Sequence, residues 1–157
     1  MFRFHDQIPD HCIDPLLGML GRYGSMGIRN SIEILSLTHR DALMGAVMYR
    51  QNHVYVAIEH IVVAYHNRRR RCGMALIREM ERKIAHTRRR GVHAVVDSSN
   101  VTACHFFKAC GWDPTFYSGF VDTSGDRIPD VWRFEYTNPW YVIQNRLVRG
   151  LKRYRDG

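Results

Sequence analysis

The sequence predicts a single domain of the mixed α/β (α+β) class, with helices on both faces of a mixed, mostly antiparallel sheet. Three apolar segments separated by short turns, residues 31–37, 43–49 and 54–64, favour consecutive antiparallel strands. Residues 58–112 then follow the order strand, basic turn, helix, strand and helix. With 157 residues, 45% of them hydrophobic, the chain is long enough and apolar enough for one packed core.

The region before the first of these strands predicts a short strand followed by helical pieces, over residues 1–29. Asp14 is expected to cap a helix whose first residue is Pro15. Asn52 and His53 are typical of a turn and are expected to join the second and third strands of the meander.

The second half of the chain predicts alternating helices and strands. The first helix is expected to run from Gly73 to near Arg90, with Gly91 as its C-terminal signal. Residues 93–97 predict a strand, and residues 101–109 predict a second helix.

A hairpin with a loose loop is expected near the C-terminus, its strands at residues 115–121 and 130–136. Beyond it, residues 138–157 predict a basic amphipathic helix that starts near Pro139. We expect its apolar face to pack on the sheet or on a second copy rather than on a membrane. The predicted organisation is therefore a domain at residues 1–137 and a helical extension at 138–157.

Arginine supplies nearly all of the net charge of +8, because lysine occurs only at positions 83, 108 and 152. A genome that favours arginine codons would explain this composition. A polyanionic partner would explain it equally well: a nucleotide cofactor, a nucleic acid or an acidic protein.

The cysteines at positions 12, 72, 104 and 110 lack the paired spacing of a zinc site, so no metal is expected. The first residues are charged and mixed, which argues against a secretory leader. No apolar run reaches the length of a membrane-spanning helix. These observations favour free thiols and a cytoplasmic location.

The most informative segment joins an apolar strand to the basic turn Asn67-Arg68-Arg69-Arg70-Arg71-Cys72-Gly73, and a long amphipathic helix follows at once. A cationic turn at a helix N-terminus favours a polyphosphate ligand. In this order of elements, residues 58–112 resemble the GNAT superfamily of acyl-CoA-dependent N-acyltransferases. The resemblance implies acetyl-CoA as cofactor and a cofactor-binding half at residues 54–112.

In that family the turn has the pattern Arg/Gln-x-x-Gly-x-Gly/Ala, and two registers compete for it here. Arg70-x-x-Gly73-x-Ala75 fits literally, whereas Arg68-x-x-Arg71-x-Gly73 requires an arginine in place of the first glycine. Family members place apolar residues three, four and seven positions after the last residue of the motif.

Counting from Gly73 gives Leu76, Ile77 and Met80, whereas counting from Ala75 gives only charged residues. A helix turned the second way would bury three charges, at a cost of several kcal/mol each when unpaired. The second register is therefore preferred. In it, the side chain of Arg71 either swings aside and attracts phosphate or narrows the site.

A second matching block is Asn100-x-x-Ala103-x-x-Phe106-Phe107-x-x-x-Gly111-Trp112. The resemblance implies that Asn100 bonds the pantetheine arm or nearby backbone. The family often has tyrosine as general acid where this chain has Phe107, and phenylalanine cannot donate a proton. A water molecule, Tyr117 or solvent would have to replace it, and Phe107 itself is interpreted as core packing.

The resemblance places the cofactor contacts at Ile61, Val62, Val63, Arg68, Arg69, Arg70, Arg71, Cys72, Gly73, Met74, Ala75, Asn100, Ala103, Phe106 and Phe107.

Glu59 is the candidate general base, because it is a carboxylate inside an apolar strand just upstream of the turn. The competing interpretation is a rim carboxylate paired with an arginine. His60 is expected on the opposite face of the strand. Cys104, His105 and Cys110 share one predicted helix and are interpreted as packing residues rather than as a nucleophilic site.

The resemblance implies an N-acetyltransferase that transfers an acetyl group to an amine of a protein or small molecule by direct attack in a ternary complex. A GNAT-like protein that modifies or binds nucleic acid is an alternative, supported by the net charge and the basic C-terminal segment. A non-catalytic interaction module is a third hypothesis. An oligomer is compatible with each.

Overall fold

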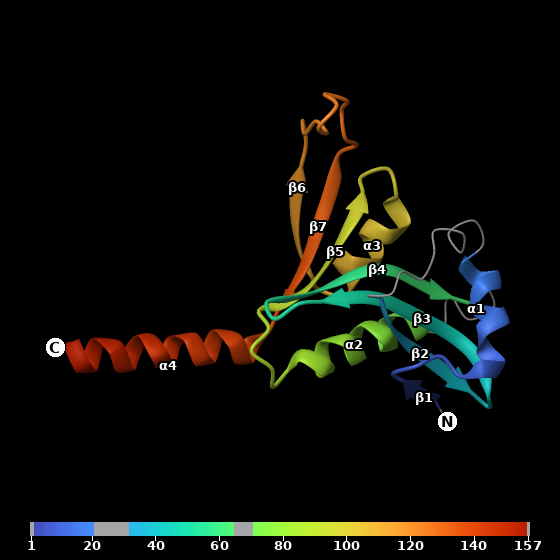
Figure 1. Ribbon diagram of the computed structural model, residues 1–157, viewed down its shortest axis with the longest axis horizontal. Coiled ribbons are helices and arrows are strands. Elements are labelled where there is room, and N and C mark those ends of the chain that lie inside the picture. The colour runs from blue at the N-terminus through green and yellow to red at the C-terminus, as the bar shows by residue number, and fades with distance from the viewer. Residues whose placement is uncertain (1, 21–31, 65–70, 157) are drawn as a thin grey trace. The chain divides into compact units, whose positions relative to one another are not determined.

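The computed structural model describes residues 2–20, 32–64 and 71–156. Within these ranges seven strands form one mixed sheet in the order β1-β2-β3-β4-β5-β7-β6. Figure 1 shows the elements in chain order, from β1 in blue to α4 in red. The mixed α+β class that the sequence predicts is confirmed.

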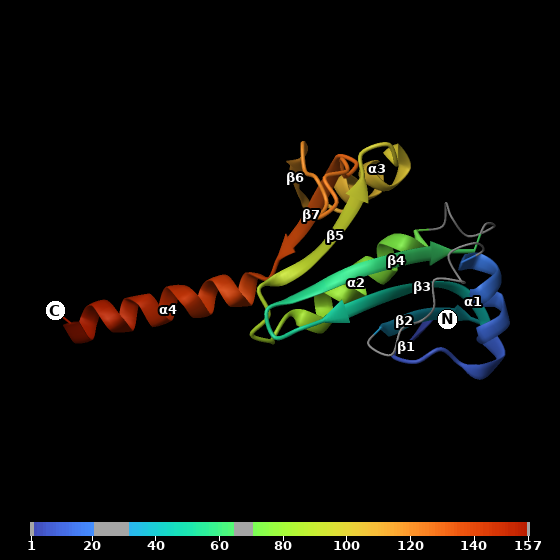
Figure 2. The same cartoon turned by 45° about the horizontal axis from the view of Figure 1, so that its top comes forward.

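The first of two compact units comprises Met1–Arg50 and Ala57–Met80. Its strands run antiparallel from β1 to β2 and from β2 to β3 (Figure 2). All three strands of the predicted meander are therefore present, each within a few residues of its expected bounds. The elements of this unit are β1 (Phe2–His5), the 3-10 turn η1 (Asp10–Cys12), α1 (Ile13–Leu20), β2 (Glu33–His39), β3 (Ala42–Gln51), most of β4 (Tyr55–Val63) and most of α2 (Cys72–Ile84).

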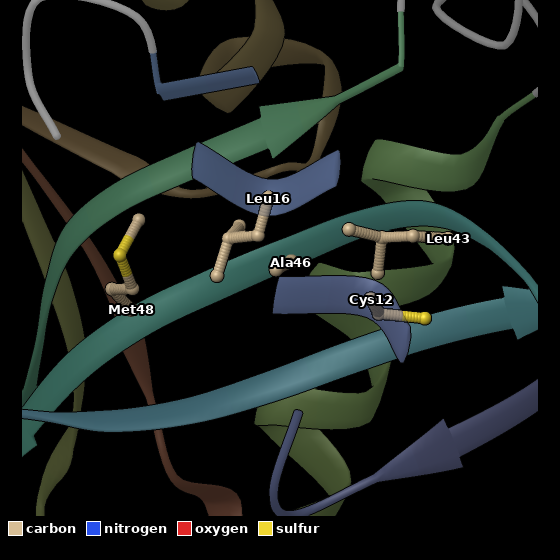
Figure 3. Packing of buried hydrophobic residues seen from close by; sticks show 5 residues of the cluster. All are labelled: Cys12, Leu16, Leu43, Ala46 and Met48. Carbon is tan, nitrogen blue, oxygen red and sulfur yellow. The ribbon is translucent and has the colours of Figure 1, made fainter. Parts of the chain in front are cut away.

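Strand β3 is covered on both faces. Figure 3 shows Cys12 and Leu16 in front of it, beside Ala46 and Met48, while α2 lies behind the sheet. On the other face, a Cβ added at Gly45 would come within 3.1 Å of a methyl carbon of Leu76 in α2. The expectation of helices on both faces is confirmed for this unit.

Helix α1 begins two residues earlier than the sequence suggests. Its first residue is Ile13, directly after η1, so Asp14 lies inside the first turn and is not the N-cap. The amide of Cys12 donates to the carbonyl of Pro9 at 2.8 Å, which starts the turn upstream of the predicted cap. Burial of the Cys12 side chain favours this earlier start, and Pro15 is tolerated because first-turn amides need no helical acceptor.

The second unit comprises Gln51–Val56 and Glu81–Gly157. Strand β7 pairs antiparallel with both β5 and β6. The predicted strand at 93–97 and the helix at 101–109 are confirmed. The hairpin is present, but its first strand spans residues 113–117 rather than 115–121. The elements that lie wholly in this unit are β5 (Gly91–Asp97), α3 (Val101–Ala109), β6 (Asp113–Tyr117), β7 (Val131–Thr137) and α4 (Pro139–Asp156).

Helix α2 ends at Ile84, six residues before its predicted end, where the amide and the hydroxyl of Thr87 donate to the Ile84 carbonyl at 3.0 Å and 2.8 Å. A tertiary contact adds to this local turn. The fully buried side chain of Asn138 donates to the carbonyl of Ile84 at 2.8 Å and to that of Arg89 at 3.0 Å. An amide 54 residues along the chain therefore binds a carbonyl at the end of the helix, which no local pattern could reveal.

Gly91 opens β5 and does not terminate a helix, so its predicted role is wrong. A Cβ at this position would clash with the carbonyl oxygen of Tyr136 on β7. Glycine is required here because two strand backbones approach closely, not because a helix needs a left-handed end.

Helix α4 begins at Pro139 as expected, but most of its apolar face is exposed rather than packed on the sheet, and packing on a second copy stays a prediction. The Trp140 ring contacts the ring of His86 at 5.6 Å between centroids. Further along, Leu147 is 62% exposed and Leu151 is 70% exposed. In the described part of the chain, no helix is long and apolar enough to cross a membrane.

Candidate functional site

Arg71, the last residue before α2, has the left-handed φ of 62°. Its carbonyl accepts a hydrogen bond from the amide of Ala75 at 2.9 Å, which starts the helical ladder. Left-handed backbone favours glycine and is strained for most other residues. The chain thus keeps, at position 71, the conformation of a glycine while carrying an exposed arginine side chain.

The orientation of α2 agrees with the register that ends at Gly73. Leu76, Ile77 and Met80 are almost completely buried, whereas Arg78 and Arg82 are exposed. The buried face predicted for this helix is confirmed. Arg68, Arg69 and Arg70 lie outside the described residues.

The N-terminus of α2 has the electrostatics of an anion site. Cys72 and Gly73 are buried, Met74 and Ala75 are half-buried, and the first turn holds no acidic residue. First-turn amides lack helical acceptors and lie at the positive end of the helix dipole. Together with Arg71, they provide donors and positive charge for a phosphate group.

The end of β4 leads toward this turn and is only half-buried at Ile61, Val62 and Val63. The next residue, Ala64, donates its amide to the carbonyl of Met44 at 2.9 Å, which holds the strand end to β3. Residues 61–63 and 71–75, which are the described part of the predicted cofactor contacts in this region, lie in the same compact unit.

Glu59, the candidate base, forms an ion pair with Arg50 on the neighbouring strand, with Oε1 3.4 Å from Nε. Both side chains are about two-fifths exposed, at 39% and 40%. This geometry fits the alternative interpretation of a rim carboxylate paired with an arginine. His60, the next residue, lies on the opposite face by strand alternation.

Asn100 bonds nearby backbone, which is one of its two predicted roles. It is the N-cap of α3, and its side-chain oxygen accepts from the amide of Ala103 at 3.2 Å. Just before it, the carboxylate of Asp97 accepts from the hydroxyl and the amide of Ser99, at 2.6 Å and 2.8 Å. Both hydrogen bonds lower the pKa of the Asp97 carboxyl, and the bond from the hydroxyl has the larger effect.

Phe107 is a core residue, as interpreted from the sequence. It is 3% exposed, and its ring lies 5.2 Å from that of Trp112 and 5.6 Å from that of Phe134. Phe106, on the same helix, is half-buried and contacts Phe107 edge to face.

The packing interpretation is confirmed for the two cysteines around α3 and is wrong for His105, whose side chain faces solvent. Cys104 and Cys110 are buried, whereas His105 is exposed. All four cysteines are free thiols.

One polar cluster in the second unit was not predicted. The guanidinium carbons of Arg133 and Arg90 lie 5.2 Å and 5.9 Å from the centre of the Tyr55 ring, and His93 meets that ring edge-on at 5.4 Å. Arg133 also bonds Glu135 at 3.2 Å. These residues are far apart in sequence, so no spacing signal could have found them.

A family model settles the class of the protein. The model of the acetyltransferase (GNAT) family matches residues 20–112, more than half of the chain. The chain belongs to the GNAT family. It is therefore an acyl-CoA-dependent acetyltransferase, and acetyl-CoA is the donor that this family uses.

Solved structures of GNAT proteins share the fold at low sequence identity. NAA60 from Arabidopsis thaliana, in complex with a bisubstrate analogue, is 17% identical with a TM-score of 0.64, over 87% of this chain and 98% of its own. The ribosomal-protein-S18-alanine N-acetyltransferase from Escherichia coli is 12% identical with a TM-score of 0.68, over 88% and 94%.

A GNAT acetyltransferase from Elizabethkingia anophelis, with acetyl-CoA bound, is 13% identical with a TM-score of 0.68, over 87% and 97% of the two chains. At these identities the likeness establishes the fold of the GNAT domain. No curated protein matches the sequence.

Proposed function

We propose that this protein transfers an acetyl group from acetyl-CoA to an amine of a protein or small molecule, by direct attack in a ternary complex. The observation that carries the proposal is the left-handed backbone of Arg71 immediately before α2. It supports a phosphate-binding turn of the family type in a chain that lacks the family's glycine.

In this reaction the lone pair of a neutral amine attacks the thioester carbonyl. A C–N bond forms, the C–S bond breaks, CoA leaves as a thiolate and the amine loses a proton. The amides of the described turn hold the pyrophosphate, and residues 61–63 supply the strand along which the acyl group lies. Cofactor contact by Asn100, Ala103, Phe106 and Phe107 stays a prediction.

An amine acceptor is supported by the neighbours. The Escherichia coli structure is named as an N-acetyltransferase for an alanine of a ribosomal protein. This chain carries its own candidate for the proton acceptor, Glu59, and we propose that role for it.

Thermal unfolding tests the phosphate turn. Acetyl-CoA at 100 times its dissociation constant adds about 2.7 kcal/mol, or roughly 5–10 °C in Tm for a domain of this size. ATP serves as the polyanion control and is expected to give a smaller shift.

Two substitutions at position 71 distinguish the effect of the backbone conformation from the effect of the side-chain charge. Arg71→Gly keeps the left-handed backbone and is expected to retain most of the shift with acetyl-CoA. Arg71→Val opposes that backbone, because β-branched residues rarely adopt positive φ, and is expected to lose both stability and the shift. An unaltered shift in Arg71→Val would show that the turn does not hold the cofactor.

Glu59→Gln tests the base. If Glu59 accepts the amine proton, turnover at neutral pH falls roughly 100-fold or more while the KM for acetyl-CoA stays the same. Arg50→Gln, which breaks the ion pair but keeps the carboxylate, is the matched control and is expected to retain turnover within a few fold. Full turnover and an unchanged pH profile in Glu59→Gln would leave it a rim carboxylate.

A further inference from the structure

Helix α4 presents an apolar stripe to solvent. Ile143 is 47% exposed, and exposure rises at Leu147 and Leu151 further along the helix. At about 100° per residue, these three and Trp140 fall within an arc of roughly 80°. Contact of this stripe with an apolar partner would be favourable, because it would remove the exposed apolar side chains from water.

The same helix is strongly basic. Its sequence holds five cationic residues and one acidic residue, Asp156, at its end. By helical angle, the cations flank the apolar stripe on both sides: Arg146, Arg149 and Arg153 on one, Lys152 and Arg155 on the other.

The start of α4 is tied to the second unit. The side-chain oxygen of Asn138 accepts from the amide of Trp140 at 3.2 Å, while its amide holds the carbonyls of Ile84 and Arg89. The ring contact of Trp140 with His86 adds to this anchor. A surface that binds α4 is therefore linked to the unit that carries β5 and α3.

We propose that α4 lies in the plane of an anionic lipid surface, with its apolar stripe among the acyl chains and its cations at the headgroups. Charge complementarity selects this occupant, since a lipid bilayer offers an apolar layer and negative charge side by side. A second copy of α4 would bring two cationic helices together. Nucleic acid would match the cations but leave the leucines in water.

Vesicle co-sedimentation of the full chain tests the proposal. The protein is expected to bind vesicles that contain phosphatidylserine and to remain in solution with pure phosphatidylcholine. Leu147→Glu combined with Leu151→Glu is expected to lower binding at least tenfold. Arg149→Gln combined with Arg153→Gln is expected to lower it roughly fivefold for each charge removed.

The matched control is Val121→Glu, which places a charge on another exposed apolar residue, 61% exposed in the hairpin loop. It is expected to bind vesicles like the unchanged protein. Thermal unfolding and acetyl transfer to a small amine should be the same in all variants, so a loss of binding is not a loss of the fold.

Three results would overturn the proposal. One is failure to bind either kind of vesicle, and another is an equal loss of binding in Val121→Glu. The third is binding of a different partner to α4 in the absence of lipid binding. That partner would be a second copy if sedimentation equilibrium showed a dimer that Leu147→Glu dissociates. It would be a nucleic acid if the protein showed salt-sensitive binding to duplex DNA or RNA that Leu147→Glu leaves intact.

Discussion

At the scale of single residues, Arg71 combines a backbone conformation that favours glycine with a cationic side chain. The family's glycine permits a left-handed backbone and close approach of a phosphate. In this chain Arg71 has the left-handed backbone, with a φ of 62°. Its exposed side chain stands where the family's glycine leaves room for a phosphate. The register chosen from the helix pattern placed the arginine there, but only the structure revealed its backbone.

Asp97 gives a prediction at this scale, because folding lowers its pKa through the two hydrogen bonds from Ser99. A carboxyl group with a lower pKa in the folded state contributes stability above its unfolded pKa, and that stability is lost as the pH falls through the folded value. Ser99→Ala removes the hydroxyl bond. We therefore expect the pKa of Asp97 to rise toward its ordinary value.

An NMR titration of the Asp97 carboxyl carbon measures this shift directly. The stability difference between Ser99→Ala and the unchanged protein should be present at neutral pH and should shrink in acid, once the carboxyl is protonated in both states. Ser98→Ala is the neighbouring control and should leave the titration unchanged. A pKa that does not move in Ser99→Ala would contradict the assigned cause.

At the scale of elements, the two glycines Gly91 and Gly18 make a matched pair. A Cβ at Gly91 would meet the backbone of Tyr136, which cannot move without disturbing the pairing of β5 with β7. A Cβ at Gly18 in α1 meets nothing within 4 Å. Gly91→Ala is expected to lower the free energy of unfolding by roughly 1–3 kcal/mol.

Gly18→Ala is expected to be neutral or stabilising by roughly 0.5–1 kcal/mol, since alanine favours a helix over glycine. Urea denaturation of both variants measures the difference. Equal stabilities would mean that the close approach of the Tyr136 backbone does not require a glycine at position 91.

At the scale of the whole molecule, the cysteines report on cooperativity. Cys12 and Cys72 are buried in the first unit, and Cys104 and Cys110 are buried in the second. Burial also raises the pKa of the Cys12 thiol, which slows its reaction further. None of the four is expected to react with a thiol reagent in the native protein.

If the chain unfolds as one cooperative domain, all four thiols become reactive at the same urea concentration. Mass spectrometry after brief alkylation across a urea series measures each site separately. Earlier reaction of the first pair than of the second would show that the two units unfold independently, and would contradict a single domain.

The sequence by itself determined the fold class, the strand order of the meander, the helix at 101–109 and the register of α2. Each rests on a local pattern: alternation, a helical face or an N-cap such as Asn100. It also brought out the GNAT resemblance that the family model confirms. Local patterns were sufficient because burial of one face sets the period of each element.

Only the tertiary structure revealed the contact of Asn138 with the end of α2, why Gly91 is a glycine, which partner Glu59 has and that α4 leaves its apolar stripe exposed. Asn138 acts on Ile84 across 54 residues, and Tyr136 excludes a side chain at Gly91 from a neighbouring strand. Interactions of this range depend on which segments meet after folding. No window of sequence contains them, so they follow from the assembled packing alone.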